Sequence, residues 1–431
     1  MDFSIFAYIA ILLLVALLST RLVRILKLPN VTGYIVTGII MGPFVFGLLF
    51  NGFTYDGIKE SIIYQHVNRI NWVSTVALGF IAFSIGTSFK KATIKALGKR
   101  VLIITVLEAL GATVLVLIAL LALHFIFPDY ISIELVLTLA AIASATAPAA
   151  TLMVIKQYQA RGPLVDTLLP VVALDDAAAL ILFAIFFQLA NTFASGVPLS
   201  IYTVLLKPLI EIAISLVSGL VIGLFISFMN RFFKSRNNRL IWCIFSVFAA
   251  LGIYMLFKSE ALGGFELSSL LICMMAGSIY TNFVSDSNRT LDVMDRFTSP
   301  VYMMFFVISG ASLDLTIFFN RNGLIVVGIA AAYVIFRFVG KWIGAFSGAT
   351  ITKCESKIKK YLGFALIPQA GVAIGLATTA YTLFNKNPDT ALAGSLILAI
   401  ILTSTLIYEL IGPMVAKFAL NKAGEIPKEN L

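Results

Sequence analysis

Two adjacent aspartates in the middle of an apolar stretch are the residues of this sequence best placed to do chemistry. Asp175 and Asp176 stand about halfway along the apolar run 163–190. A charge at the centre of a bilayer costs about 2.5–3.5 kcal/mol on insertion scales, so charged groups there usually pair, line a cavity or carry function. Adjacent helical residues point about 100° apart. One carboxylate can therefore face a partner while its neighbour faces a water-filled path; the alternative is a polar pair that only holds helices together.

A lysine and an arginine share one face of a second apolar run, 322–349. Lys341 follows Arg337 by four residues, which is one helical turn. A buried lysine can release a proton near neutral pH, and it needs a carboxylate partner that the aspartate pair can supply. Arg337 stays charged, and we expect a structural role for it, paired with Glu108 in the run 101–127. The alternative for Lys341 is that its chain reaches the inner membrane surface.

Two further apolar runs are interrupted in the middle. The run 133–155 contains Ala145 to Thr151 with Pro148, and the run 361–382 contains Ile367 to Gly371 with Pro368 and Gln369. Proline removes a helix hydrogen bond, and non-helical backbone at this depth survives only inside protein or beside a cavity. Broken half-helices direct their dipole ends at the bilayer centre, where they can form an ion site. The alternative is a plain proline kink in each helix.

The elements that must position these groups are membrane spans. Of the 431 residues, 60% are hydrophobic and only 12% are charged, which excludes a soluble domain of this length. Apolar runs of about 20 residues recur along the chain, and each is long enough to cross a bilayer. The sequence predicts an all-α polytopic membrane protein with about thirteen spans, near 3–24, 30–50, 71–89, 101–127, 133–155, 163–190, 208–229, 239–257, 261–282, 298–316, 322–349, 361–382 and 391–416.

The spacing of the spans predicts an inverted-topology repeat. Spans four to six correspond to spans eleven to thirteen, and an offset of seven reverses their direction, so the two broken helices run opposite ways and cross. We expect this division of the chain: scaffold and dimerisation spans 1–90, core 91–191, connector 192–234, scaffold 235–318, core 319–420 and a short cytoplasmic tail 421–431.

The distribution of positive charge predicts the orientation. The formal net charge is +10; of the 31 lysines and arginines, 23 fall on one side of the predicted spans and 6 on the other. Positive residues concentrate on the cytoplasmic side. The N-terminus is therefore expected outside and the C-terminus inside, and the basic excess requires no nucleic-acid partner.

Several patches, in this order along the chain, resemble the cation:proton antiporter superfamily, in its monovalent cation:proton antiporter-2 branch. The resemblance covers nearly the whole chain. It rests on the glycine-rich segment Gly33 to Pro43, Thr-Ala-Pro-Ala-Ala-Thr at Thr146 to Thr151, Asp175-Asp176, Phe305-Phe306 with Gly310 and Asp314, Gly340-Lys341, Pro368-Gln369 with Gly371, and Glu409 with Gly412-Pro413.

The resemblance implies roles for these residues. The aspartate pair with a lysine is similar to the electrogenic sodium/proton members, whereas electroneutral relatives tend to have Asn-Asp and a glutamate where this chain has Leu169. Asp176 would be the main carboxylate for cation and proton, Asp175 would pair with Lys341 when the cation is absent, and Thr146 would offer an oxygen to the cation. Lys341 would lose its bond to Asp175 when the cation binds and can itself release a proton. Ala147 departs from members with an acidic residue there.

These expectations make the chain a secondary transporter that exchanges sodium, or lithium, for protons by alternating access, with a role in pH homeostasis. The resemblance implies a homodimer in a bacterial cell membrane, with no cofactor and no metal beyond the transported cation. The missing nucleotide-binding tail argues against a potassium/proton antiporter, which remains the first alternative. A sodium-coupled organic-anion symporter, a channel and a non-transporting membrane sensor are more distant alternatives. The sequence contains no nucleophile, redox centre or phosphate loop that would indicate an enzyme.

Overall fold

Every described element of the protein is a helix, as the sequence predicts. The computed structural model describes residues 3–25, 30–47, 62–87, 89–128, 130–147, 151, 154–155, 158–194, 206–233, 235–258, 267–284, 287–314 and 323–427. No strand occurs among these residues. Nine of the described helical segments are long and apolar enough to cross a membrane.

The helices follow the predicted spans closely. The first half of the chain contains α1 (Phe3–Ile25), α2 (Asn30–Met41), η1 (Pro43–Gly47), α4 (Ile62–Ile70), α5 (Trp72–Thr87), α6 (Lys91–Ile126), α7 (Ile133–Ile142) and α9 (Pro163–Ala194). The second half contains α10 (Lys207–Met229), α11 (Arg236–Lys258), α12 (Ser269–Phe283), α13 (Ser287–Ala311), α15 (Gly323–Ile351), α16 (Ser356–Ala365), α17 (Gly371–Phe384) and α18 (Pro388–Ala423). Each predicted span overlaps at least one of these helices.

The largest differences from the predicted boundaries lie at helix ends. α6 continues before the predicted span at residue 101, but Gly98 has φ 71°, a left-handed conformation that glycine adopts without steric cost. The chain therefore bends at Gly98 before it enters the long apolar part of α6. α13 begins eleven residues before the predicted start at residue 298, since a polar first part, rich in charged residues, precedes its apolar part.

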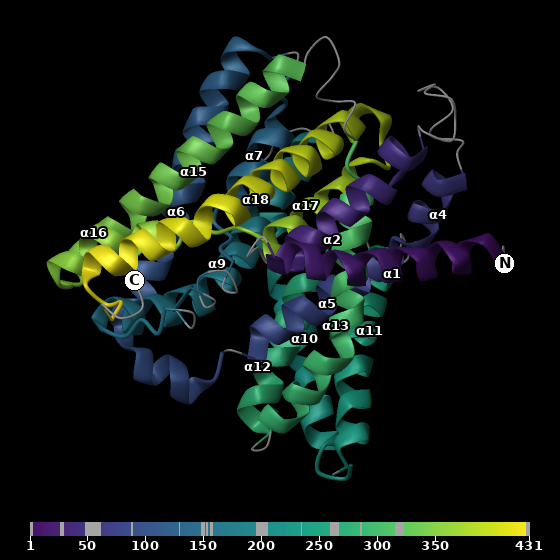
Figure 1. The fold of residues 1–431 in the computed structure, drawn as a ribbon. Helices are drawn as coiled ribbons and strands as arrows, with labels where there is room; N and C mark the ends of the chain where they lie inside the picture. Colours follow the sequence, from purple (N-terminus) through teal and green to yellow (C-terminus); the bar gives the residue numbers. More distant parts are fainter. Residues whose placement is uncertain are drawn as a thin grey trace.

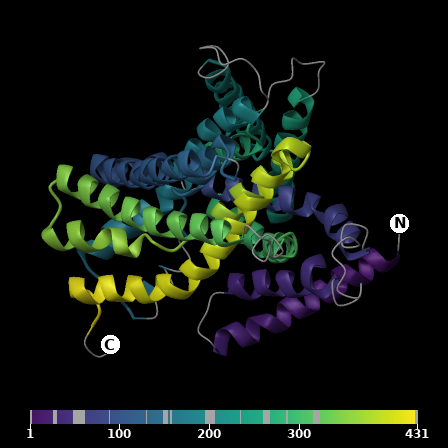
Figure 2. The same ribbon diagram turned by 90° about the horizontal axis from the view of Figure 1, so that it is seen from above.

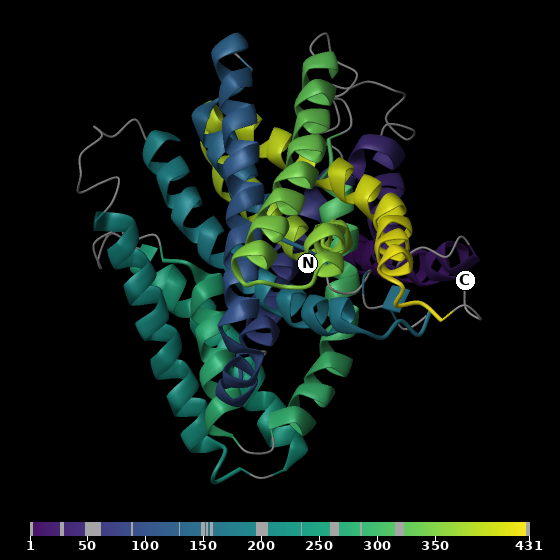
Figure 3. The ribbon, with the colours of Figure 1, turned by 90° about the vertical axis from the view of Figure 1, so that its left-hand side faces the viewer.

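The helices pack in two groups, which the three ribbon views separate (Figures 1, 2 and 3). The site bundle comprises α6, α7, α9, α15, α16, α17 and α18, which pack mainly on one another. The side bundle comprises α1, α2, α5, α10, α11, α12 and α13, of which α10 to α13 form the lower part of Figure 1. α9 and α17 provide most of the contacts of the site bundle with α5, α10, α12 and α13.

Glycines bring α6 and α15 into backbone contact. A Cβ atom added at Gly111 would lie 2.6 Å from the carbonyl oxygen of Gly340, and one added at Gly348 would lie 2.8 Å from Cα of Ile104. Residue numbers rise along α6 while they fall along α15, so the helices are antiparallel. Small residues at a helix interface permit this approach inside a membrane. The contact places the turn of Lys341 directly against the turn of Glu108.

Candidate functional site

The site is built around the place where α7 and α16 end. α7 ends at Ile142, in the middle of the predicted span 133–155, and α16 ends at Ala365, inside the predicted span 361–382. The last four carbonyl groups of a helix lack partners within it. Since α7 and α16 both end here, the site has several buried carbonyl oxygens that carry the negative end of a helix dipole.

Arg337 binds the carbonyl groups beyond both helix ends. Its Nε donates to the carbonyl oxygen of Ala143 at 3.0 Å, Nη2 to that of Ala145 at 2.6 Å, and Nη1 to that of Ile367 at 2.7 Å. The side chain is fully buried, and its guanidinium carbon lies 4.5 Å from the ring centroid of Tyr408. The planar guanidinium has donors in several directions. Arg337 therefore fastens the two breaks to each other and to α15.

The two interrupted segments also bind each other directly. The backbone N–H of Ala147 donates to the carbonyl oxygen of Pro368 at 2.8 Å. Gln369 Nε2 donates to the carbonyl oxygen of Ile142 at 3.2 Å and to the hydroxyl of Tyr333 at 2.9 Å. Helix resumes only at Gly371, the first residue of α17, so the region of Pro368 is a true break and not a kink. Pro148 lies outside the described residues.

The prediction that Arg337 pairs with Glu108 is wrong. Glu108 Oε1 instead accepts a hydrogen bond from Lys341 Nζ, with both side chains fully buried. The reason is the antiparallel glycine contact, which sets Lys341 opposite Glu108 and leaves Arg337 one turn nearer the helix breaks. Lys341 does not reach a membrane surface either, since its side chain is 0% exposed.

Lys341 has more acceptors around it than it has protons to donate. Besides Glu108, Nζ donates to the carbonyl oxygen of Ser144 at 2.6 Å, to Thr146 Oγ1 at 2.7 Å and to Asp175 Oδ2 at 3.1 Å. Thr146 Oγ1 in turn donates to Asp175 Oδ2. An ammonium group has three donors. The contact with Asp175 is the longest of the four, so it is the one that Lys341 can lose without leaving an N–H group unsatisfied.

The aspartate pair lies in the middle of α9, and it holds oxygens without partners. Asp175 is fully buried, whereas Asp176 is 7% exposed. Within the described part of the chain, Oδ1 of Asp175, Oδ1 of Asp176 and Oε2 of Glu108 are buried and accept no hydrogen bond. Buried polar atoms are nearly always satisfied in folded proteins. Three such oxygens in one site are suited to a ligand that supplies positive charge, either a proton or a small cation.

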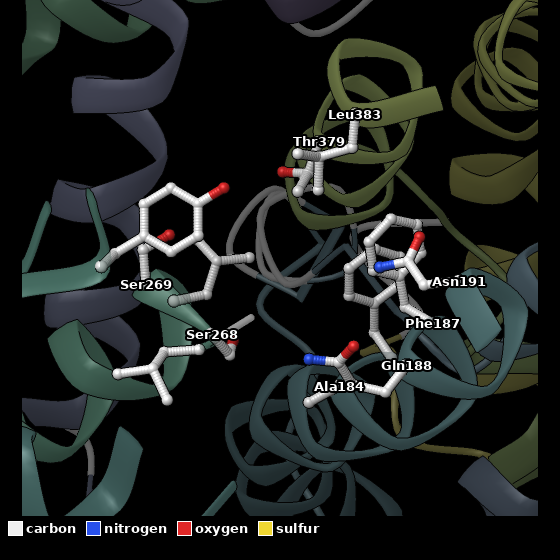
Figure 4. A pocket seen from close by; sticks show the side chains of 12 residues that line it. Ala184, Phe187, Gln188, Asn191, Ser268, Ser269, Thr379 and Leu383 are labelled. Carbon is white, nitrogen blue, oxygen red and sulfur yellow. The ribbon is translucent and has the colours of Figure 1, made fainter. Parts of the chain in front are cut away.

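A small cavity lies between the bundles, along the C-terminal half of α9. It has a volume of about 60 Å³ and is lined by α9, α11, α12 and α17. Figure 4 shows Gln188 and Asn191 of α9 on one side of it and Ser268 and Ser269 on the other, with Thr379 of α17 above. The aromatic rings of Phe183 and Phe187 stack at 4.8 Å on the α9 wall.

A second crevice adjoins this cavity and shares Tyr254, Thr379 and Leu383 with it. Its volume is about 160 Å³, and Ser74 and Thr75 of α5 and three threonines of α17 are among the residues that line it. The two spaces together separate part of the site bundle from α5, α11 and α12. They bring several hydroxyl and amide side chains to the boundary where the bundles meet.

Several residues that shape the site escaped the sequence analysis. Gly344 and Gly348 are two of them; with Gly340 they recur every fourth residue on α15, a spacing that indicates close helix packing. That pattern could have predicted the contact with α6. Tyr333 and Tyr408, which support Gln369 and Arg337, carry no comparable signal, because isolated tyrosines are common in membrane helices.

Comparison with known proteins agrees with this arrangement. The profile of the family described as "Sodium/hydrogen exchanger, transmembrane" matches residues 9–419. The fold is similar to two structures of the sodium proton antiporter MjNhaP1 from Methanocaldococcus jannaschii. The structure at pH 8 has a TM-score of 0.67 at 18% identity, with 97% of this chain and 99% of that chain covered. The structure described as a 3D EM map has a TM-score of 0.72 at 17% identity, with 99% of this chain and 100% of that chain covered.

A search of curated proteins found no match. The family match nevertheless covers most of the chain, and the similar folds are those of antiporters. Proteins of this kind are membrane transporters and not enzymes. The chain belongs to the sodium/hydrogen exchanger family.

Proposed function

We propose that this protein exchanges sodium, or lithium, for protons by alternating access, and that the exchange is electrogenic. The observation that carries the proposal is the set of unpartnered carboxylate oxygens on Asp175 and Asp176, beside a lysine that has a surplus of acceptors. The name of the similar MjNhaP1 structures, a sodium proton antiporter, supports the choice of cation.

In this proposal the cation binds between the two aspartates and the broken helix. Asp176 is the principal ligand, because its Oδ1 has no partner in the described chain and the side chain keeps some exposure. Asp175 and Thr146 add oxygens once Asp175 leaves Lys341. Hard cations need several oxygen ligands to replace their water. Backbone carbonyl groups near the break and water complete the shell.

The surplus of acceptors around Lys341 provides the coupling. When the cation approaches, Asp175 turns towards it, and Lys341 keeps Glu108, Thr146 and the carbonyl group of Ser144 as partners. A nearby carboxylate stabilises an ammonium group in its charged form. The ammonium group of Lys341 therefore keeps a full set of acceptors when Asp175 leaves it, and in this proposal the transported protons are carried by Asp175 and Asp176.

The charge of the site then differs between the two loaded forms. With Glu108 and Lys341 charged, a cation on ionised Asp175 and Asp176 leaves the site with one net negative charge. Protonation of both aspartates without a cation leaves the site neutral. Two protons thus cross in one direction for each cation in the other, so membrane voltage drives the exchange.

Alternating access follows from motion between the bundles. We propose that the site bundle is the transport core and the side bundle the scaffold, which dimerises in the cell membrane. The N-terminus lies outside and the C-terminus in the cytoplasm, as the positive charges indicate. The cavity and crevice beside α9 and α17 then open towards the outside and form the outer access path.

Lys386 offers a test of this access path. Of the described lining residues of the crevice, Lys386 alone carries a charge, and it is exposed. A positive charge there repels the entering cation. We expect Lys386→Gln to lower the KM for external sodium about two- to fivefold at low ionic strength, without change in maximal rate. High concentrations of choline chloride should remove the difference by screening.

The measurement compares right-side-out and everted membrane vesicles. KM should change on the outer side only, and Lys360→Gln, which removes an exposed charge on α16, should leave both values unchanged. An unaltered outer KM, or equal changes on both sides, would remove Lys386 from the path.

The exchange itself is tested in liposomes that contain an internal pH dye. A pH gradient is imposed, and sodium, lithium or potassium is added in turn, with the voltage clamped and unclamped. A pH change with sodium or lithium that responds to voltage is the expected result. A change with potassium alone would replace the cation, and no change with any cation would reject antiport.

A further inference from the structure

A second buried carboxylate lies outside the ion site, at the boundary between the two bundles. Glu409 of α18 is 2% exposed, and it accepts a hydrogen bond from the hydroxyl of Thr32 of α2, which is 5% exposed. α18 belongs to the site bundle and α2 to the side bundle. Membrane-buried carboxylates are costly and usually functional, and the exchange chemistry described above does not use Glu409.

Each partner is held firmly by its own bundle. On the α18 side, the neighbouring Tyr408 donates its hydroxyl to the carbonyl oxygen of Val334 at 2.7 Å, and an added Cβ at Gly412 would lie 2.9 Å from Pro368 Cγ. The turn of Glu409 is therefore attached to the helix break. On the α2 side, an added Cβ at Gly38 would lie 2.8 Å from the backbone nitrogen of Ala311 in α13. Motion between the bundles must stretch or break the bond between Thr32 and Glu409.

No cationic side chain that the structure describes forms an ion pair with Glu409. The described ionisable side chains on the last turns of α1, on α2, and near mid-membrane on α9, α15 and α18 are Arg21, Tyr34, Asp175, Asp176, Tyr333, Arg337, Lys341 and Tyr408. Within the described chain, none of them forms a hydrogen bond or ion pair with Glu409. Arg337 and Lys341, the two buried cations of this set, already bind carbonyl groups and other carboxylates. One hydroxyl donor cannot replace the hydration of an ionised carboxylate.

We propose that Glu409 is a second proton-binding site. While Glu409 is protonated, its hydrogen bond with Thr32 holds the site bundle against the side bundle, and this contact is called the latch below. The proposal rests on the transport function above, since it describes how that motion is regulated. In the conformation described here Glu409 is neutral and bonded to Thr32. When the bundles separate, water reaches the carboxyl group and it ionises. The latched form therefore holds one more proton than the released form, and rising pH favours release.

Two substitutions should shift the pH dependence of exchange in opposite directions. Glu409→Gln keeps the shape of the neutral acid and cannot ionise, so the rise of activity with pH should be lost or moved to higher pH. Thr32→Val removes the hydroxyl and weakens the latch, so activation should begin about 0.5–1 pH unit lower. The readout is the rate of sodium-driven pH change in liposomes, at saturating sodium, across a series of pH values.

The controls separate a latch from a structural contact. Thr32→Ser keeps the hydroxyl and should retain the wild-type profile, as should Thr37→Val at another buried threonine of α2. If Glu409→Gln and Thr32→Val lowered the rate of exchange by the same factor at every pH, the shape of the pH profile would be unchanged. That result would overturn the latch. Absence of exchange in the wild-type protein would instead reject the transport function on which the latch rests.

Discussion

Asp176→Asn should abolish exchange, with a loss of at least about 100-fold in the rate of sodium-driven pH change. The amide keeps the size of the carboxyl group but can neither take up a proton nor neutralise a cation. The charge pair that the variant loses is the one between Asp176 and the bound cation; loss of one partner of a buried charge pair costs about 3–5 kcal/mol, and 1.4 kcal/mol corresponds to a tenfold change. The measurement is the liposome assay with sodium and lithium at several pH values.

The matched control for this prediction is on the same helix. Asp166 lies in the first turn of α9 and is exposed, so Asp166→Asn should exchange at the wild-type rate. Asp176→Asn should also retain the folded state, since Asp176 Oδ1 accepts no hydrogen bond from the described chain. Normal exchange in a correctly folded Asp176→Asn protein would refute the assignment of Asp176.

Lys341→Gln should destabilise the protein strongly, because it leaves Glu108 and Asp175 buried without a counter-charge. Removal of one member of a buried ion pair costs about 3–5 kcal/mol. Addition of Glu108→Gln to this variant removes one of the two orphaned charges, and we expect it to restore a large part of the lost stability. Thermal unfolding in detergent, followed by the fluorescence of the intrinsic tryptophans, measures both effects. Lys360→Gln on the exposed face of α16 should unfold like the wild type.

Glu108→Gln alone should weaken the binding of sodium. With Glu108 neutral, Lys341 holds Asp175 more tightly, so the cation must compete with a stronger ion pair and the KM for sodium should rise. Additive destabilisation in the double variant, or an unaltered KM in Glu108→Gln, would show that Glu108, Lys341 and Asp175 do not act as one unit.

The sequence predicts much of this fold because each span is an apolar run of sufficient length. The position of Asp175 and Asp176 in mid-span and the two proline-containing breaks were equally visible, since charges and prolines stand out against apolar surroundings. Residue type and spacing therefore sufficed to single out Thr146, Asp175 and Lys341, which the structure brings into contact.

The partners within the site were harder to predict, for reasons that Arg337 and Glu409 illustrate. Arg337 binds three backbone carbonyl groups, and such acceptors have no residue-specific signature. Its predicted partner Glu108 binds Lys341 because the helices α6 and α15 meet at glycines, a register that the predicted spans alone do not define. Glu409 and Thr32 are 377 residues apart and meet only through the packing of the two bundles.

The most direct test of the account is whether sodium and protons compete for the aspartate pair. Sodium binding to the purified protein is measured by calorimetry in two buffers that differ in ionisation heat, across a range of pH. The account predicts that binding releases protons, that the Kd for sodium rises as the pH falls, and that Asp176→Asn binds no sodium. Sodium binding to the wild-type protein without proton release, and with a Kd independent of pH, would contradict it.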